Sequence, residues 1–99
     1  MTNLLPRTTG LPMVIWIGPR YGARYDVRVK VCCVHGSRMI PTDLAVMSVR
    51  PTPELLHGDL SAADVAAVTR WIEANRDLLI DIWDENADAL SDARSFVKV

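Results

Sequence analysis

The chain has no apolar run long enough to cross a membrane. Its longest apolar segments are residues 13–17 and 29–34, and Lys30 interrupts the second, whereas a spanning helix needs about 20 apolar residues. Residues 1–12 also lack the charged start, the long apolar stretch and the small-residue cleavage site of a signal peptide. The sequence therefore predicts a cytoplasmic protein without membrane association.

Cysteine is scarce, and the two cysteines of the chain are neighbours, Cys32 and Cys33. Adjacent side chains on a strand point to opposite faces, so a disulfide between these two thiols would be strained. A structural zinc site needs four ligands at a wider spacing. We therefore predict two reduced cysteines, one of them buried, and neither a metal site nor a cofactor.

Histidine is equally scarce, and the sequence contains no recognisable catalytic arrangement. His35 and His57 each lie at the end of an expected strand, and Cys33 shares a strand face with His35. A nucleophilic pair of Cys33 and His35 is conceivable, but buried strand thiols are usually inert. Residues 18–22 contain two glycines but lack the Gly-Lys-Ser/Thr end of a phosphate-binding loop. We therefore assign no catalytic residue.

The first half of the chain has the patterns of an antiparallel sheet. Apolar residues make up 49% of the 99 residues and charged residues 23%, which is ordinary for one globular domain. β-branched and aromatic residues predict a strand over 13–17, and period-two alternation predicts strands over 24–34 and 44–50. Residues 54–57 are a candidate fourth strand.

Helical patterns dominate the second half of the chain. Ser61 followed by Asp64 resembles a capping box and predicts the start of a helix. Asn75 predicts a break, after which a second helix runs to about residue 86; one continuous helix is the alternative. The last residues, 96–99, fit either a short strand or a docked tail.

These patterns together predict an α+β fold. A three- to four-stranded antiparallel sheet is followed by two C-terminal helices packed on one face. Residues 13–99 form this single domain. Residues 1–12 contain Pro6, Gly10 and Pro12 and show no periodicity, which predicts a flexible N-terminal tail.

Charge is divided unevenly along the chain. Residues 1–53 contain seven basic and two acidic residues, whereas residues 54–99 contain four basic and ten acidic residues. A basic sheet and acidic helices can complement each other within one chain or across a dimer. The same division also fits a basic face for nucleic acid, or an acidic face for a basic partner.

Basic and aromatic residues gather around the second expected strand: Arg24, Arg28, Lys30, Tyr21 and Tyr25. Such a mixture can bind single-stranded nucleic acid. The candidate nucleic-acid face comprises Arg24, Arg28 and Lys30. Asp26 shares this face and Tyr25 lies opposite, so a solvated sheet surface is the favoured interpretation.

A candidate protein interface lies in the helical half. Asp77 and Asp81 belong to an acidic stripe at four-residue spacing, where like charges repel unless cations lie opposite. Trp71 and Trp83 flank the apolar helical stripe, and an indole at the rim of such a stripe suits an interface. We therefore predict an interface formed by Trp71, Asp77, Asp81 and Trp83.

Four segments resemble a family of small bacterial proteins described as a domain of unknown function. They are Val-Arg-Val-Lys-Val at 27–31, Ser-Val-Arg-Pro-Thr-Pro at 48–53, Gly-Asp-Leu-Ser at 58–61, and Trp-Ile-Glu-Ala-Asn-Arg-Asp at 71–77 followed by Trp83. The family is similar to a group often encoded beside a small antitoxin-like domain. The resemblance implies a toxin–antitoxin-like pair, and it transfers no catalytic residue.

We therefore predict a non-enzymatic protein-binding or self-associating module, acting as a homo-oligomer or with a small protein partner. The alternative is a nucleic-acid-binding protein that uses the basic sheet face. A small nuclease-like enzyme is the third candidate, and it requires His35 or His57 in a pocket with basic neighbours.

Overall fold

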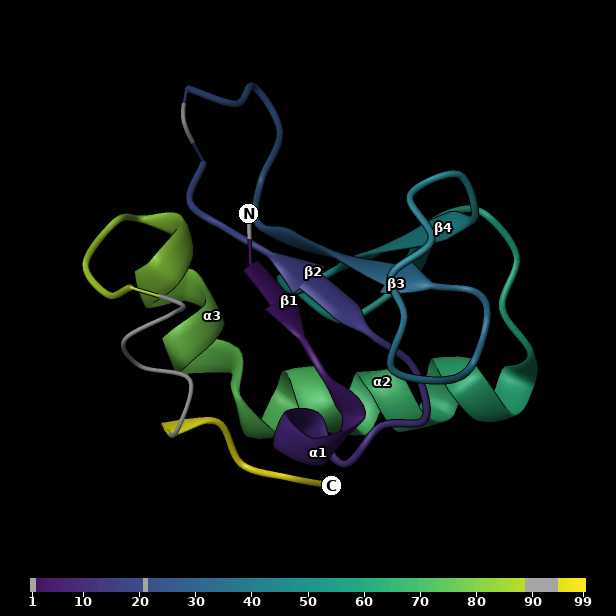
Figure 1. Cartoon of the computed structure of the whole chain (residues 1–99). Coiled ribbons are helices and arrows are strands. Elements are labelled where there is room, and N and C mark those ends of the chain that lie inside the picture. The colour runs from purple at the N-terminus through teal and green to yellow at the C-terminus, as the bar shows by residue number, and fades with distance from the viewer. Residues whose placement is uncertain (1, 21, 89–94) are drawn as a thin grey trace.

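The frame of the molecule is a five-stranded antiparallel sheet in the order β1-β2-β3-β4-β5 (Figure 1). The computed structural model describes residues 2–20, 22–88 and 95–99. The elements follow in chain order: β1 (Thr2–Leu4), α1 (Pro6–Thr9), β2 (Ile15–Ile17), β3 (Arg28–Cys32), β4 (Leu44–Ser48), β5 (Leu55–His57), α2 (Ala62–Ala74) and α3 (Arg76–Trp83). The fold is α+β, as predicted, but the sheet has five strands rather than three or four.

Four of the strands lie where the sequence predicts strands, with shorter bounds. β2 lies within 13–17, β3 within 24–34 and β4 within 44–50, and β5 is the candidate strand at 54–57. Each strand pairs with the strands that come before and after it in the chain. The sheet is therefore a meander built from local connections.

The segment before Met13, predicted to be a flexible tail, instead contributes β1 and α1. β1 pairs with β2 so that Leu4 lies opposite Ile15, and Leu4 is only 2% exposed. Pro6 begins α1, and Gly10 ends it with a left-handed φ of 79°. A three-residue strand is too short to show a period in the sequence. Pairing with β2, rather than local propensity, stabilises it.

Alternation along β3 decides which side chains face each side of the sheet. Val29 and Val31 are almost fully buried, whereas Arg28 and Lys30 are half-buried on the opposite face. A slip of one residue against β4 would turn both valines to the opposite face and bring both cations into the core. The burial pattern therefore determines the register of the central strands.

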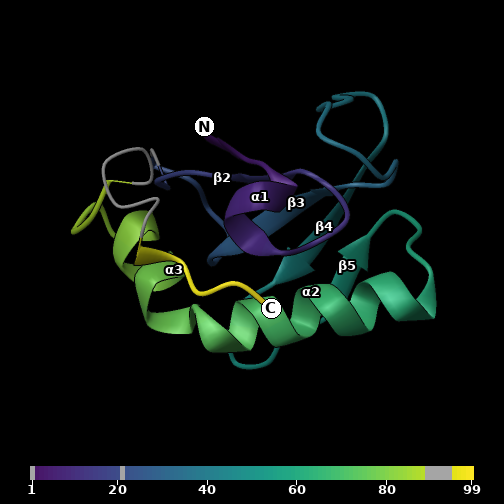
Figure 2. The same ribbon diagram turned by 60° about the horizontal axis from the view of Figure 1, so that its bottom comes forward.

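Helices α2 and α3 lie along one face of the sheet (Figure 2). Ser61 caps α2, as predicted, because its hydroxyl accepts a hydrogen bond of 3.1 Å from the backbone N–H of Asp64. The buried residues of the two helices join the inner face of the sheet in one core: Val68, Trp71, Ile72, Leu79, Ile82 and Trp83. No described helix is both long and apolar enough to span a membrane.

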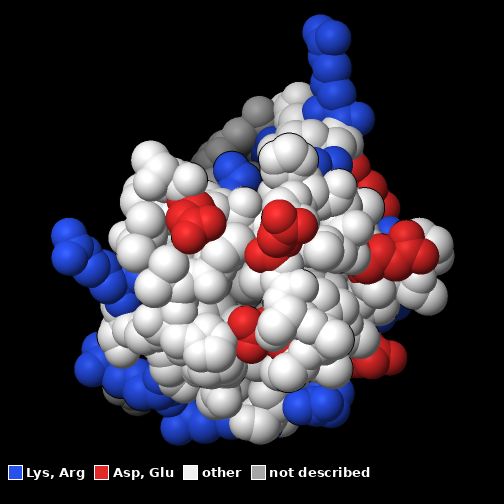
Figure 3. Space-filling model, turned by 90° about the vertical axis from the view of Figure 1, so that its right-hand side faces the viewer, with Lys and Arg blue, Asp and Glu red and all other residues white. Residues whose placement is uncertain are grey.

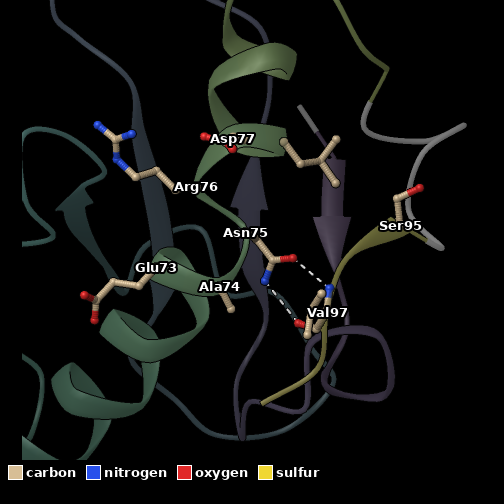
Figure 4. A pocket seen from close by; sticks show the side chains of 8 residues that line it. Glu73, Ala74, Asn75, Arg76, Asp77, Ser95 and Val97 are labelled. Carbon is tan, nitrogen blue, oxygen red and sulfur yellow. Dashed lines mark hydrogen bonds between the residues drawn. The ribbon is translucent and has the colours of Figure 1, made fainter.

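Asn75 separates α2 from α3, which confirms the predicted break. Its side chain is buried and forms three hydrogen bonds with described residues. The amide nitrogen donates to the carbonyl oxygen of Trp71 at 2.9 Å. It also donates to the carbonyl oxygen of Val97 at 3.0 Å, and the amide oxygen accepts from the Val97 N–H at 2.7 Å (Figure 4). The break between the helices is therefore also the anchor of the C-terminal residues.

Residues 95–99 form a docked tail, one of the two arrangements expected for the end of the chain. Phe96 stacks on Trp71 with ring centroids 5.5 Å apart. The Val99 N–H donates to the carbonyl oxygen of Thr9 at 3.0 Å. A Cβ at position 10 would collide with the Val99 carbonyl oxygen, so Gly10 lets the tail approach α1 closely. The tail therefore closes the core between α1 and the helix junction.

We expect Asn75→Ala to lower the free energy of unfolding by about 2 kcal/mol or more, because it leaves the N–H and C=O of Val97 without their partner. Urea unfolding followed by circular dichroism measures the change. Asn86→Ala is the matched control, since Asn86 is exposed and its side chain has no hydrogen bond to a described residue. Equal urea midpoints for Asn75→Ala and the wild-type chain would contradict the anchoring role.

Candidate functional site

The structure corrects the predicted helical interface of Trp71, Asp77, Asp81 and Trp83. Trp71 is fully buried and Trp83 is 4% exposed, because the apolar stripe of the helices faces the sheet. Only Asp77 and Asp81 lie on the surface. The two tryptophans are therefore not available for the predicted interface, and the two aspartates are exposed charges on α3.

An open pocket of about 380 Å³ lies where α2, α3 and the docked tail meet (Figure 4). Asn75 lies in its lining, and both ends of its amide are already bonded to Val97. The charged ends of Glu73 and Arg76 point away from Asn75. The pocket therefore offers no set of converging polar groups that could perform catalysis.

The cysteines and histidines do not come together as a nucleophilic site. Burial, followed in importance by the neighbouring Asp43, raises the pKa of the Cys33 thiol. The thiol therefore stays protonated at neutral pH, which is the opposite of nucleophile activation. Cys32 is buried, and His57 lies exposed on β5. Within the described residues, no group of three or more potential metal ligands occurs.

His35 has a structural partner on the helical side of the molecule. Its Nε2 lies 2.8 and 3.0 Å from the two carboxylate oxygens of Asp64, in the first turn of α2. In the predicted capping box, the Asp64 side chain would bond back to the backbone of Ser61. Instead, its carboxylate contacts His35 in the connection between β3 and β4. His35 therefore ties that connection to the start of α2.

Two of the three residues of the predicted basic face are brought together on the outer face of the sheet. The guanidinium of Arg28 lies 3.8 Å from the centroid of the Tyr25 ring, and the ammonium of Lys30 lies 5.1 Å from that of Trp16. Arg24 is exposed in the connection that precedes β3. The sequence patterns did not indicate the contact between Trp16 and Lys30. Only the pairing of β2 with β3 places these two residues side by side.

Asp26, the acid on the same side of the sheet, is paired. The Arg50 Nε donates to both of its carboxylate oxygens, at 2.9 and 3.0 Å, and the Val27 N–H donates to one of them at 2.8 Å. These bonds, chiefly that of Arg50, hold the pKa of the Asp26 carboxyl below its usual value. The charge of Asp26 is therefore compensated by Arg50, close to the two cations that contact aromatic rings.

A different surface feature lies at the edge of the sheet. β5 pairs only with β4, and its three residues are all exposed. Leu55 and Leu56 are 38% and 48% exposed; the other exposed large apolar residues of the described chain are Tyr25, Val34, Val97 and Val99. The outer backbone groups of such an edge strand can pair with another chain.

The charge distribution on one side of the molecule is mixed. On the side that Figure 3 shows, acidic side chains lie separately near the middle and along the right-hand edge, with uncharged surface between them, and basic side chains lie mainly at the top, left and bottom. The division of charge along the sequence therefore does not produce a single-sign surface on this side.

Comparison of the chain with protein-family models, with curated proteins and with solved structures finds no match. The function must therefore be argued from the surfaces described above: the outer face of the sheet and the β5 edge.

The ion pair of Asp26 and Arg50 predicts a pH-dependent contribution to stability. Because folding lowers the pKa of Asp26, this contribution is full above the pKa of an unfolded aspartate, about 3.9, and is lost as the pH falls through the lower folded value. We expect Asp26→Asn to destabilise the protein at pH 7 and to have no effect at acid pH below both values.

Urea midpoints of the wild-type chain and Asp26→Asn, measured across this pH range, check the prediction. The effect should be small and should decrease with salt, since both side chains are about a third to a half exposed. Asp81→Asn, which removes an exposed carboxylate from α3, is the control. A destabilisation by Asp26→Asn that persists below both pKa values would show that the ion pair is not its cause.

Proposed function

We propose that the protein is a self-associating module that pairs through β5 with β5 of a second copy. The observation that supports this best is the exposed apolar edge formed by Leu55 and Leu56. Charged side chains are one of the ways in which natural sheets protect an edge, and β5 contains no Lys, Arg, Asp or Glu. An apolar edge without charged side chains is the feature expected of a strand that has a partner.

A second copy suits this edge because the strand is compatible with itself. In a twofold dimer the same surface meets itself, so any charge in it would face a like charge. The uncharged sequence Leu-Leu-His avoids this repulsion. Antiparallel pairing about a twofold axis would bring Leu56 of one copy close to Leu56 of the other and would join the two sheets.

Local structure limits this pairing to a short segment. The ladder between β4 and β5 is irregular at Val46 and Met47, and Pro53 lies just before the strand. At the other end, a Cβ on Gly58 would lie 2.8 Å from the Cα of Ala45, so the chain turns tightly against β4 there. Pairing of β5 with β5 about a twofold axis uses the same edge of both copies, which favours a closed dimer over an open-ended fibre.

Within the described residues, helices α2 and α3 offer no equivalent apolar surface. The tryptophans expected to form an interface lie in the core, and the remaining candidates, Asp77 and Asp81, are charges of the same sign. A small protein partner is the second candidate for β5, which is consistent with the sequence resemblance to a family encoded beside an antitoxin-like domain. Strand addition is the shared mode of binding in both cases.

We expect light scattering to detect a dimer whose fraction rises with protein concentration and changes little with salt, because the contact is apolar. Leu56→Asp should weaken association roughly tenfold, since it replaces an apolar contact with two facing carboxylates. Val34→Asp is the matched control, because Val34 is 42% exposed in the connection after β3. Circular dichroism establishes that both variants fold.

A crosslinking experiment separates β5 pairing from other modes of self-association. Under mild oxidation, Leu56→Cys should form a disulfide-linked dimer much faster than Val34→Cys. A monomeric wild-type chain at all concentrations would overturn the proposal of self-association. A dimer that Leu56→Asp leaves intact would show that the copies associate elsewhere.

A further inference from the structure

We propose that the outer face of the sheet binds single-stranded nucleic acid, with Arg28 and Lys30 contacting phosphates and Trp16 stacking on a base. This face is distinct from the β5 edge, and the proposal does not depend on self-association. It is supported by three features: two positioned cations, a compensated acid and a half-buried aromatic ring on the same face.

The two cations are held by aromatic rings rather than by acids. Arg28 lies over Tyr25 and Lys30 over Trp16, at 3.8 and 5.1 Å from the ring centroids. Among residues 2–20, 22–88 and 95–99, neither cation has a carboxylate within ion-pair distance. Their charges are therefore positioned, yet remain available to an anion.

The stacking of Arg28 belongs to a longer column of side chains. Tyr25 contacts Trp83 of α3 on the core side, with ring centroids 5.6 Å apart. The Nε of Arg28 is buried and has no hydrogen-bond partner among the described residues. The position of this guanidinium therefore depends on Tyr25, and Trp83 in turn supports Tyr25 from the core.

Arg28 and Lys30 lie two residues apart on the same face of β3, which separates their backbone positions by about 6.6 Å. The nearby Asp26 is bonded to Arg50 through both carboxylate oxygens, so it does not cancel these charges. The central part of the outer face therefore has a net positive charge. A flexible polyanion can contact both cations at once.

Trp16 adds a stacking surface beside the cations. It is half-buried on the outer face, between Asn3 of β1 and Lys30 of β3 in the sheet register. Beyond Lys30, the same row continues with Val46 of β4. The described helices α2 and α3 lie on the other side of the sheet (Figure 2), so they leave this row uncovered.

The combination of charge and ring favours a single strand over other anions. A free phosphate needs cations alone, and an acidic peptide has no bases to stack. A duplex keeps its bases paired, whereas a single strand offers both phosphates and unstacked bases. Flat sheet faces with cations and aromatic rings bind such strands in known nucleic-acid-binding folds.

The first test is fluorescence anisotropy of a labelled oligothymidylate titrated with the full-length chain. The logarithm of the affinity should fall linearly with the logarithm of the salt concentration, and Lys30→Gln and Arg28→Gln should each lower the slope by roughly 0.7. Arg70→Gln is the matched control, because Arg70 is exposed on α2. An equal effect of the control would assign binding to general electrostatics and overturn the proposal.

The second test uses intrinsic fluorescence, which distinguishes stacking from charge. Trp71 and Trp83 are buried, so quenching by the oligonucleotide should come from Trp16. Trp16→Phe should abolish the quenching while preserving the fold, and Trp16→Ala should weaken binding roughly tenfold. Quenching that persists in Trp16→Phe would place the bases elsewhere.

Competition experiments identify the class of ligand that binds the outer face. Unlabelled oligothymidylate should displace the probe, whereas a duplex of equal length, inorganic phosphate and polyglutamate should compete far less well. Equal competition by duplex or by polyglutamate would overturn the assignment to a single strand, as would the absence of any oligothymidylate binding.

Discussion

The hydrogen bonds between Asn75 and Val97 connect most parts of the helical side of this protein. One buried amide ends α2, precedes α3 and bonds both backbone groups of a residue near the C-terminus. A buried amide is tolerated only when its polar atoms are paired, and here the tail provides two of the three partners. The bend between the helices and the docking of the tail are therefore one structural feature.

This anchor has consequences for the core. It brings Phe96 against Trp71, and the tail then reaches Thr9 beside α1 through the N–H of Val99. The core thus includes residues from both ends of the chain. The same packing buries the indole of Trp71 completely, which is why the helical surface does not provide an apolar interface.

With the inner face covered, two surfaces of the described sheet have distinctive chemistry. The β5 edge is apolar and uncharged, whereas the outer face has two cations held by aromatic rings. These surfaces suit different partners, since strand pairing uses backbone groups and apolar side chains, and polyanion binding uses charge and stacking. The two proposals therefore concern separate surfaces of one small sheet, and each surface can be altered without the other.

Local patterns in the sequence predicted the α+β class, four of the five strands, the cap at Ser61 and the break at Asn75. Each of these features depends on residues that lie within one strand or within one or two turns of a helix. The alternation along β3 also placed Arg28 and Lys30 on one face. Only the tertiary structure decided the rest. β1 exists through pairing with β2, Trp71 and Trp83 are buried through packing against the sheet and the tail, and Trp16 meets Lys30 through strand register. These features join residues distant in sequence, so no local pattern specifies them.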